Sequence, residues 1–463
     1  MNSKSSRREE LFVSDKTGFD RIDAATWDKA EAYAAAYMNF LDAGKTERCC
    51  VETATEQARK RGFSEFRRGQ SYKPGDKVYF SHWGKSMALA VIGRQPLSAG
   101  LRIMAAHVDV PRIDLKANPV YEDSGLALLR THYYGGIRKY QWMALPLELR
   151  GVVCKTDGTT VRLSIGSAPG DPVFVITDLL PHLAGDQGKK SLGEAFSGEA
   201  LNILFGSRPD PEEGPDRVRL AVLDQIFKLY GIREEDFASA EISAVPLQNA
   251  REVGLDRSLI GAYGHDDRGC SYAGLHAILE TENPEHTAVC ILADKEEIGS
   301  EGVTGMQSAF LDDFFEELCT AQKVPLRTCY AHSFCLSGDV TVGFDPNYAD
   351  VYEKRNTAFL NRGVGICKYT GSGGKSRASD ASAETVARVR RLFDENGVLF
   401  QMAELGKVDQ GGGGTVAAYF ARRNIEVLDA GFPVLAMHAP FEIASKLDLY
   451  MMYRACAALF GEK

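Results

Sequence analysis

The sequence predicts an α/β protein whose main domain is interrupted by a β-rich insert. Beyond Leu255, short apolar runs typical of strands alternate with segments typical of helices. Residues 120–254 have strand patterns of their own and a polar, proline-rich loop, SRPDPEEGPD, which indicates a separate unit. A chain of 463 residues is also longer than a single hydrophobic core usually supports. We therefore expect residues 1–119 and 255–463 to form the main domain around the insert.

The residues before the insert change from helical to strand patterns at about Lys77. Residues 26–43 and 45–61 are rich in Ala, Glu and Lys, and they are followed by Gly44 and Gly62, a residue type that commonly ends helices. After Lys77, the runs KVYF, MALAVIG and LRIMAA predict strands because they alternate or are continuously apolar. The last run leads directly into the segment HVDVP.

The insert and the residues after it have their own predicted elements. In the insert, the runs ALLRTHYY, LELRGVV, VRLSIG and VFVIT predict strands. After the insert, helices are predicted over residues 267–281, where an Asn-Pro pair follows, and over residues 380–395, where a glycine follows. The runs AVCILA and HSFCLSG predict strands between these helices.

The composition excludes several classes of partner. The formal net charge is −9, whereas nucleic-acid binders usually carry a basic patch. The first residues, MNSKSSRREELF, lack the apolar core of a secretion signal, and no apolar run approaches the roughly 20 residues that span a bilayer. We therefore expect a cytoplasmic protein with no nucleic-acid or membrane partner. The ten cysteines include no CxxC pair, which predicts reduced, mostly buried thiols and no cysteine ligand to a metal.

Two predicted strands lead to histidines. The run LRIMAA leads to His107, and Asp109 follows two residues later, so both side chains lie on the same face of extended backbone. A histidine there can bind a metal while the carboxylate orients it. The run GFPVLAM leads to His438 in a proline turn, with Glu442 shortly after it. Taken singly, each histidine could also be structural.

Three further segments place carboxylates at the ends of strands or at the start of a helix. Asp266 and Asp267 stand at the entrance to a predicted helix, where a carboxylate could cap the helix or bridge two cations. Glu296 and Glu297 follow the strand AVCILA, and one can bind a metal while the other acts as a general base, unless the pair lies in an exposed loop. Asp339 follows the strand HSFCLSG, as a ligand or as part of an ordinary turn.

Six phrases of the sequence resemble, in wording and order, the aspartyl aminopeptidase family of dinuclear metallopeptidases. They are HVDVPRIDLK, YYGGIRKYQW, DKEEIGS, SGDVTVGFDPNY, GGGGT and MHAPFE. The resemblance implies a catalytic domain with a mixed central sheet flanked by helices, as in zinc exopeptidases. It also equates the insert with the family's dimerisation domain. Members of the family assemble as dodecamers, so the resemblance implies a homo-oligomer.

The resemblance implies two divalent ions in each subunit, with zinc as the expected metal and manganese or cobalt as alternatives. Carboxylate and imidazole ligands without thiolate suit these metals. By resemblance, His107 and Asp339 would bind one ion, and Glu297 and His438 the other. Asp266 would bridge the two ions.

Two more residues acquire catalytic roles through the resemblance. Glu296 would be the general base toward a metal-bridging hydroxide, and Asp109 would orient His107. Asp267 stands where the family usually has asparagine, so it is not included among the ligands.

The residues expected to contact substrate come from three segments: His182, Lys375, Gly413, Gly414 and Thr415. In the family, the histidine reaches into the active site of a neighbouring subunit, and the lysine lies near the cation that meets an acidic substrate side chain. The glycine run would form a wall of the substrate site, because glycine lets a ligand approach the backbone. The alternatives are a buried loop histidine, a surface lysine and a flexible loop. The wording around the lysine departs from that of the family, which leaves the substrate preference open.

The expected function is removal of N-terminal residues, acidic ones among them, from peptide substrates. A related dinuclear carboxypeptidase or N-acyl amino acid deacylase is the alternative, since it would use the same ligand types. A second alternative is a non-catalytic, self-assembling scaffold. The presence of every candidate ligand and of Glu296 speaks against a decayed site.

Overall fold

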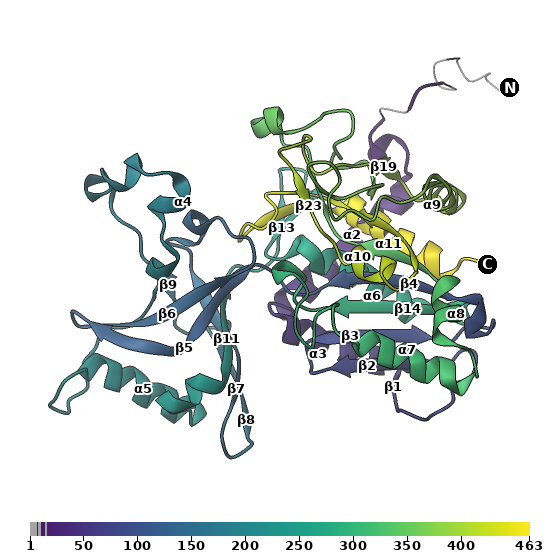
Figure 1. Ribbon diagram of the computed structural model, residues 1–463. Helices are drawn as coiled ribbons and strands as arrows, with labels where there is room; N and C mark the ends of the chain where they lie inside the picture. Colours follow the sequence, from purple (N-terminus) through teal and green to yellow (C-terminus); the bar gives the residue numbers. More distant parts are fainter. Residues whose placement is uncertain (1–6, 8–10, 14–15) are drawn as a thin grey trace.

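The computed structural model describes residues 7, 11–13 and 16–463, so the predicted segment 1–119 lies partly outside the described residues. Figure 1 shows a main body and a second lobe that projects to one side of it. The main body is built around a nine-stranded sheet, and the lobe around a separate seven-stranded sheet. The predicted mixed α/β fold is confirmed.

The nine-stranded sheet combines parallel and antiparallel pairs. Strands β14, β4, β15 and β21 are mutually parallel. At the two borders of this group, β3 is antiparallel to β14 and β17 is antiparallel to β21. Along the sheet the order is β1 (Ser64–Glu65), β2 (Lys77–His82), β3 (Ser86–Val91), β14 (Thr287–Ala293), β4 (Leu101–His107), β15 (Phe334–Gly338), β21 (Glu426–Gly431), β17 (Val364–Cys367) and β19 (Phe400–Met402).

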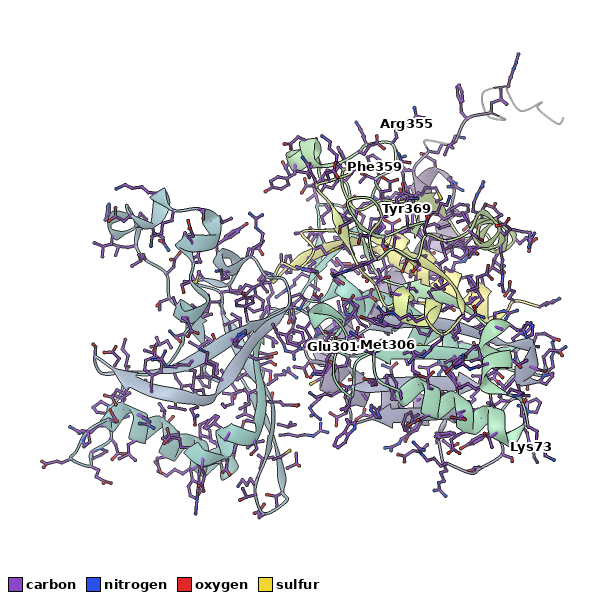
Figure 2. All side chains as sticks on the ribbon, in the orientation of Figure 1. Lys73, Glu301, Met306, Arg355, Phe359 and Tyr369 are labelled. Atoms are coloured by element: carbon purple, nitrogen blue, oxygen red, sulfur yellow. The ribbon has the colours of Figure 1, made fainter. Side chains whose placement is uncertain are left out.

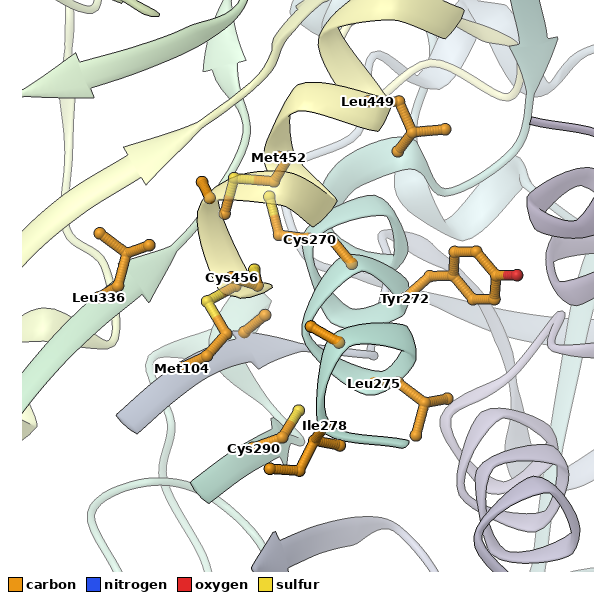
Figure 3. Packing of buried hydrophobic residues seen from close by; sticks show 14 of the residues in the cluster. Met104, Cys270, Tyr272, Leu275, Ile278, Cys290, Leu336, Leu449, Met452 and Cys456 are labelled. Carbon is orange, nitrogen blue, oxygen red and sulfur yellow. The ribbon is translucent and has the colours of Figure 1, made fainter. Parts of the chain in front are cut away.

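Helices cover both faces of this sheet, which explains why its central strands are continuously apolar. Along β4, Met104 and Ala106 face one hydrophobic core, and Ile103 and Ala105 face another. Figure 3 shows the first core, where Met104 packs near Cys270 and Cys456. The helices of the first core are α2 (Ala24–Ala43), α3 (Glu47–Lys60), α6 (His265–Glu280), α9 (Ala383–Glu395) and α11 (Lys446–Phe460); those of the second are α7 (Phe310–Ala321), α8 (Leu326–Ala331) and α10 (Ala417–Ala421).

The predicted helix starts are displaced by a few residues because capping side chains set them. Thr46 accepts a hydrogen bond from the backbone N–H of Cys49 and starts α3, and Ser382 does the same with Thr385 at α9. Neither α7 nor α5 (Arg217–Tyr230) is among the helices predicted from the sequence. The helical spacing of Phe310, Phe314 and Leu318, all buried in α7, was the available signal.

The second lobe is an antiparallel sheet with α5 packed against it and a core of its own that includes Trp142 and Leu149. The strands of this sheet lie between Arg112 and Pro246. The insert boundaries at 120 and 254 and the dimerisation role of the insert stay predictions. Its order is β8 (Thr160–Ile165), β7 (Leu147–Cys154), β11 (Ala240–Pro246), β5 (Arg112–Asp123), β6 (Leu126–Tyr134), β10 (Ile203–Gly206) and β9 (Val175–Ile176); the short α4 (Leu192–Ala195) lies at its far end.

Two smaller sheets complete the described strands. One has the order β12 (Arg251–Val253), β13 (Leu259–Ala262), β23 (Glu442–Ser445), β22 (Pro433–Leu435) and β16 (Thr341–Val342), and the other pairs β18 (Gly371–Ser372) with β20 (Gly412–Gly413). Eight of the ten cysteines are buried, and all ten are free thiols within the described chain. Among the described helices, none combines the length and the apolar composition that crossing a bilayer requires.

Candidate metal centre

Three parallel strands deliver predicted ligands to one edge of the nine-stranded sheet. His107 is the last residue of β4, and it is the register partner of Ala293, the last residue of β14. Glu296 and Glu297 follow that strand in the turn Glu296–Ile298. Asp339 comes directly after β15, which pairs with β4 on its other side. Because the carboxyl ends of parallel strands meet at one edge, these side chains lie close together.

Asp266, at the start of α6, lies between the two predicted histidine ligands. Its Oδ1 is 3.3 Å from Nε2 of His107, and its Oδ2 is 3.1 Å from Nε2 of His438. The Asp266 side chain is buried. One carboxylate therefore presents a separate oxygen to each histidine.

The remaining predicted ligands complete two groups of donor atoms. His107, Asp266 and Glu297 form one group and His107, Asp267 and Asp339 the other, each with ligand atoms within 4.8 Å of one another. Oε1 of Glu297 is also 3.6 Å from Nε2 of His438. Asp267, which the sequence analysis left out of the ligand set, is thus a further donor beside His107.

The donors in this centre fit divalent cations. Three buried oxygens have no hydrogen-bond partner among the described residues: Asp266 Oδ1, Asp267 Oδ1 and Glu297 Oε1. Leaving a buried acceptor unpaired costs about 1–3 kcal/mol, and more for a charged group, so several unpaired carboxylate oxygens in one place indicate a cation-binding site. Imidazole and carboxylate donors without thiolate match a zinc site with open coordination positions.

Burial and like charges make three carboxylates of this centre hard to ionise in the protein alone, whereas the hydrogen bonds of Asp266 to both histidines outweigh its burial and lower its pKa. Burial, followed by the charge of neighbouring carboxylates, raises the pKa of Glu297 and of Asp339 well above the usual range. Burial raises the pKa of Glu296 to about 7. Burial opposes the protonation of His438, but its hydrogen bond to Asp266 and the charge of Glu297 outweigh this effect and raise its pKa to about 10. A bound cation would stabilise the ionised carboxylates.

Both histidines direct Nε2 toward the carboxylates because backbone carbonyls hold their other ring nitrogen. Nδ1 of His107 is 3.0 Å from the carbonyl oxygen of Asp109, and Nδ1 of His438 is 2.9 Å from the carbonyl oxygen of Gly136. Donation of Nδ1–H to a carbonyl leaves the Nε2 lone pair available for a metal.

Asp109 is buried, and its carboxylate holds the turn that bears the two glutamates. Oδ1 accepts the backbone N–H of Glu296 at 3.1 Å, and Oδ2 accepts that of Glu297 at 3.2 Å. The carboxylate is 3.4 Å from Nδ1 of His107, farther than the carbonyl of the same residue. The carbonyl oxygen of Asp109, as well as its carboxylate, is therefore placed to orient the His107 ring, and this orienting role stays a prediction.

Glu442 is buried, and it has no role among those predicted from the sequence. It accepts the backbone N–H of His438 at 2.7 Å and that of Asp266 at 3.1 Å. Burial raises its pKa to about 8. Glu442 thus ties together the backbones of two predicted ligands, a contact that its proximity to His438 in sequence could only suggest.

The predicted substrate-binding segments lie in loops, and two of them are neighbours. Gly413 pairs with Gly371 between β20 and β18, which brings the glycine run beside the segment that holds Lys375. Lys375 Nζ lies 3.1 Å from Asp380 Oδ1 and 4.0 Å from the ring centroid of Tyr369, which Figure 2 labels.

Two of the remaining substrate-binding candidates continue the glycine run, and the third lies in the second lobe. Gly414 follows β20, and Thr415 donates a hydrogen bond to Asp429 at 2.7 Å. His182 is exposed in the second lobe. No hydrogen bond or ion pair of the described residues joins His182 or Lys375 to the five predicted ligands, and their roles stay predictions.

Comparison with known proteins identifies the family. The aminopeptidase I zinc metalloprotease family (M18) matches residues 40–460. The chain belongs to the M18 family. A probable M18 family aminopeptidase 1 of Clostridium acetobutylicum is 45% identical over 451 residues, which cover 95% of this chain and 97% of the relative. The resemblance of the sequence to the aspartyl aminopeptidase family is confirmed, and the chain is a metallo-aminopeptidase.

Solved M18 structures share this fold. The crystal structure of an M18 aminopeptidase from Thermotoga maritima has a TM-score of 0.94 and 42% identity, and the match covers 98% of this chain and 100% of that chain. The structure of the S. cerevisiae mApe1 dodecamer has a TM-score of 0.76 at 20% identity, covering 94% of this chain and 97% of that chain. The second likeness concerns the fold alone.

Proposed function

We propose that this M18 chain is a two-zinc aminopeptidase in which Asp266 is shared by both ions. His107 and Asp339 would hold one zinc, and His438 and Glu297 the other. The observation that carries the proposal is the Asp266 carboxylate, whose two oxygens separately face the two histidines at 3.3 and 3.1 Å. A bridging carboxylate on a rigid helix start is a suitable support for paired ions.

Glu296 is the proposed general base. When bound, two divalent ions would polarise the scissile carbonyl and acidify an attacking water. Oε2 of Glu296 lies 4.0 Å from Nε2 of His107, and its backbone N–H is held by Asp109. Burial brings the pKa of Glu296 to about 7, where a carboxyl group can both accept a proton and return it near neutral pH. Glu296 would take the proton of the attacking water and deliver it to the leaving amine.

The substrates in this proposal are peptides with a free N-terminus, acidic first residues among them. Lys375 would offer a cation to an acidic side chain, although it must exchange its contact with Asp380 to do so. Gly413, Gly414 and Thr415 would border the substrate beside it. His182 would act from a neighbouring subunit, consistent with its exposure in the second lobe.

The proposed assembly is a homo-oligomer, with a dodecamer as the expected form and the second lobe as a dimerisation unit. The dodecameric yeast relative supports this assembly, as does the family resemblance of the sequence. A cytoplasmic location is part of the same proposal.

The proposal is tested with metal-stripped protein that is re-supplied with zinc, manganese or cobalt. We expect metal-dependent release of N-terminal residues from aminoacyl chromogenic substrates. Replacement Glu296→Gln should lower kcat by about 10²–10⁴-fold with zinc still bound, because it removes the proton acceptor. The control is Glu301→Gln. Glu301 is an exposed glutamate a few residues after Glu296, and Figure 2 labels it.

The same substrates separate the alternatives. Turnover of N-acetylated amino acids would contradict the aminopeptidase hypothesis and favour a deacylase. Absence of turnover with every metal and substrate would favour the scaffold.

A further inference from the structure

The exit of β6 from the second lobe reaches the metal centre of the main body. Residues 134–136 belong to the phrase YYGGIRKYQW, for which the proposed function gives no role. The hydroxyl of Tyr134 donates a hydrogen bond to Oδ2 of Asp109 at 2.8 Å. Two residues later, the carbonyl of Gly136 lies 2.9 Å from Nδ1 of His438. One short segment of the lobe therefore contacts both sides of the centre.

Tyr134 completes the set of donors around the Asp109 carboxylate. Oδ2 of Asp109 receives the tyrosine hydroxyl together with the backbone N–H of Glu297, while Oδ1 receives that of Glu296. A carboxylate held by three donors has little freedom to rotate. Through Asp109, the Tyr134 hydroxyl therefore helps to fix the position of the turn that carries Glu296, the proposed base, and Glu297, a proposed ligand.

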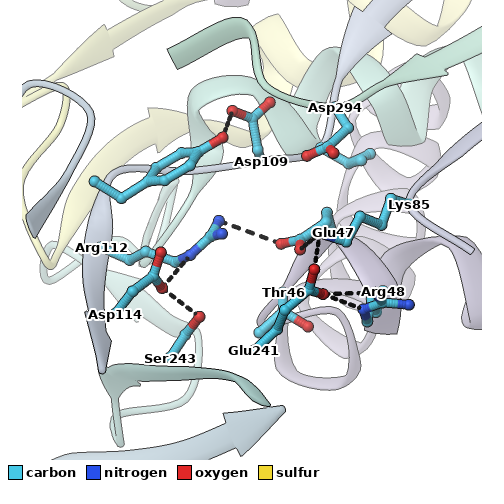
Figure 4. A network of polar contacts seen from close by, with 12 residues as sticks. Thr46, Glu47, Arg48, Lys85, Asp109, Arg112, Asp114, Glu241, Ser243 and Asp294 are labelled. Atoms are coloured by element: carbon cyan, nitrogen blue, oxygen red, sulfur yellow. Dashed lines mark hydrogen bonds and ion pairs between the residues drawn. The ribbon is translucent and has the colours of Figure 1, made fainter. Parts of the chain in front are cut away.

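The ring of Tyr134 is held in place by an ionic network between the lobe and the main body. Its cross-strand partner is Arg112, whose guanidinium lies 4.0 Å from the ring centroid. Arg112 contacts Glu47 of α3 at 3.2 Å and Asp114 of its own strand at 2.8 Å, as Figure 4 shows. Since both Arg112 and Glu47 are buried, this contact is less screened than a surface ion pair.

The two glycines after Tyr134 are explained by the closeness of the ligands. A Cβ atom at Gly135 would lie 3.3 Å from Oε2 of Glu297, and the φ of +71° disfavours other residues there. A Cβ atom at Gly136 would lie 3.2 Å from Nδ1 of His438. A side chain at either position would press on a proposed ligand.

We propose that Tyr134 is a positioning residue of the metal centre. Acting from the second lobe, its hydroxyl holds Asp109 and through it the Glu296–Glu297 turn, while the Gly136 carbonyl behind it holds His438. The seating of the lobe on the main body thus sets the geometry of the ligands. This inference rests on the proposed function of those ligands.

The test compares Tyr134→Phe, which removes only the hydroxyl, with Tyr133→Phe. Tyr133 is the exposed neighbour on the same strand and serves as the control. Zinc affinity is measured by competition of the metal-stripped protein with a chromophoric chelator, and kcat and KM on an aminoacyl chromogenic substrate. Loss of a contact behind the ligands typically costs 10- to 100-fold in metal affinity or activity. We expect Tyr134→Phe to lower zinc affinity and kcat by about tenfold or more, while KM stays within about twofold of the parent value. Tyr133→Phe should leave both zinc affinity and kcat unchanged.

A folded Tyr134→Phe protein with zinc affinity and kcat within twofold of the parent would overturn the inference. If that variant does not fold, Gly136→Ala decides, with Gly193→Ala as its control, because a Cβ atom at Gly193 meets nothing within 4 Å. Weaker zinc binding in Gly136→Ala alone would support the inference, and unchanged binding in both would overturn it.

Zinc binding also separates the two proposals. A parent protein that binds zinc and hydrolyses no substrate would contradict the proposed function, whereas the affinity comparison would still decide on Tyr134.

Discussion

The carboxylate of Asp109 accepts the backbone N–H of Glu297 across 188 residues of sequence. The contact exists because β4 and β14 are parallel and in register at their ends, so the residues after each strand meet. It joins the segment of one proposed histidine ligand to the turn of the proposed base. The geometry of that turn therefore depends on the buried side chain of Asp109.

Replacement Asp109→Asn should disrupt this turn. Asparagine keeps one acceptor oxygen and turns an N–H₂ group toward the other backbone donor, leaving that donor unpaired at a cost of about 1–3 kcal/mol. We expect a lower Tm and a kcat lowered by about 10- to 100-fold. Asp123→Asn, at the exposed end of β5, is the control. A kcat equal to that of the parent would show that the turn does not need the carboxylate.

Replacement Asp266→Asn tests the sharing of one carboxylate by two ions. A neutral amide is a poor ligand for a cation and cannot bridge a pair. Zinc content after dialysis should fall from two ions per subunit to one or fewer, as measured by elemental analysis. Asp256→Asn, in an exposed loop, should retain both ions. Two ions held with undiminished affinity in Asp266→Asn would rule out the bridge.

Asp429 gives the protein a pH-dependent stability that does not involve the metal. Burial raises its pKa to about 6, against the hydrogen bond from Thr415 that lowers it. The folded state thus binds this proton more tightly than the unfolded state, so the stabilisation is complete below about pH 4 and is lost as the pH rises through 6.

Asp429→Asn cannot ionise, so its free energy of unfolding relative to the parent should rise by about 1–1.5 kcal/mol between pH 5 and pH 8. Tm values of the two metal-stripped proteins at both pH values measure this gain, with the exposed Asp409→Asn as control. A difference in Tm that stays constant with pH would show that Asp429 does not titrate in this range.

Replacement of Lys375 tests whether the enzyme prefers substrates with an acidic N-terminal residue. Removing its cation in Lys375→Ala should raise KM for N-terminal aspartyl and glutamyl substrates by about tenfold, the equivalent of about 1.4 kcal/mol, and leave KM for alanyl and leucyl substrates unchanged. The exposed Lys323→Ala, next to α7, controls for the loss of surface charge. An equal rise in KM for acidic and neutral substrates would show that Lys375 does not determine the preference for acidic residues.

Most elements were predictable because their signals are local. The helices α2, α3 and α6, and the apolar strands β4, β14 and β15, follow from residue type and spacing within each segment. The helix α5 was missed because it follows a proline-rich loop inside a segment that otherwise predicts strands. The candidate ligands were found because each stands at the end of an apolar strand or the start of a helix.

Local residue patterns therefore account for the elements, the donor types and the family resemblance. How the donors are shared follows from the packing of distant segments: Asp266 divides its oxygens between His107 and His438, and Tyr134 of the second lobe reaches Asp109. These contacts depend on strand register and on the seating of the lobe. Such relations join residues far apart in the chain, and no local pattern encodes their distances.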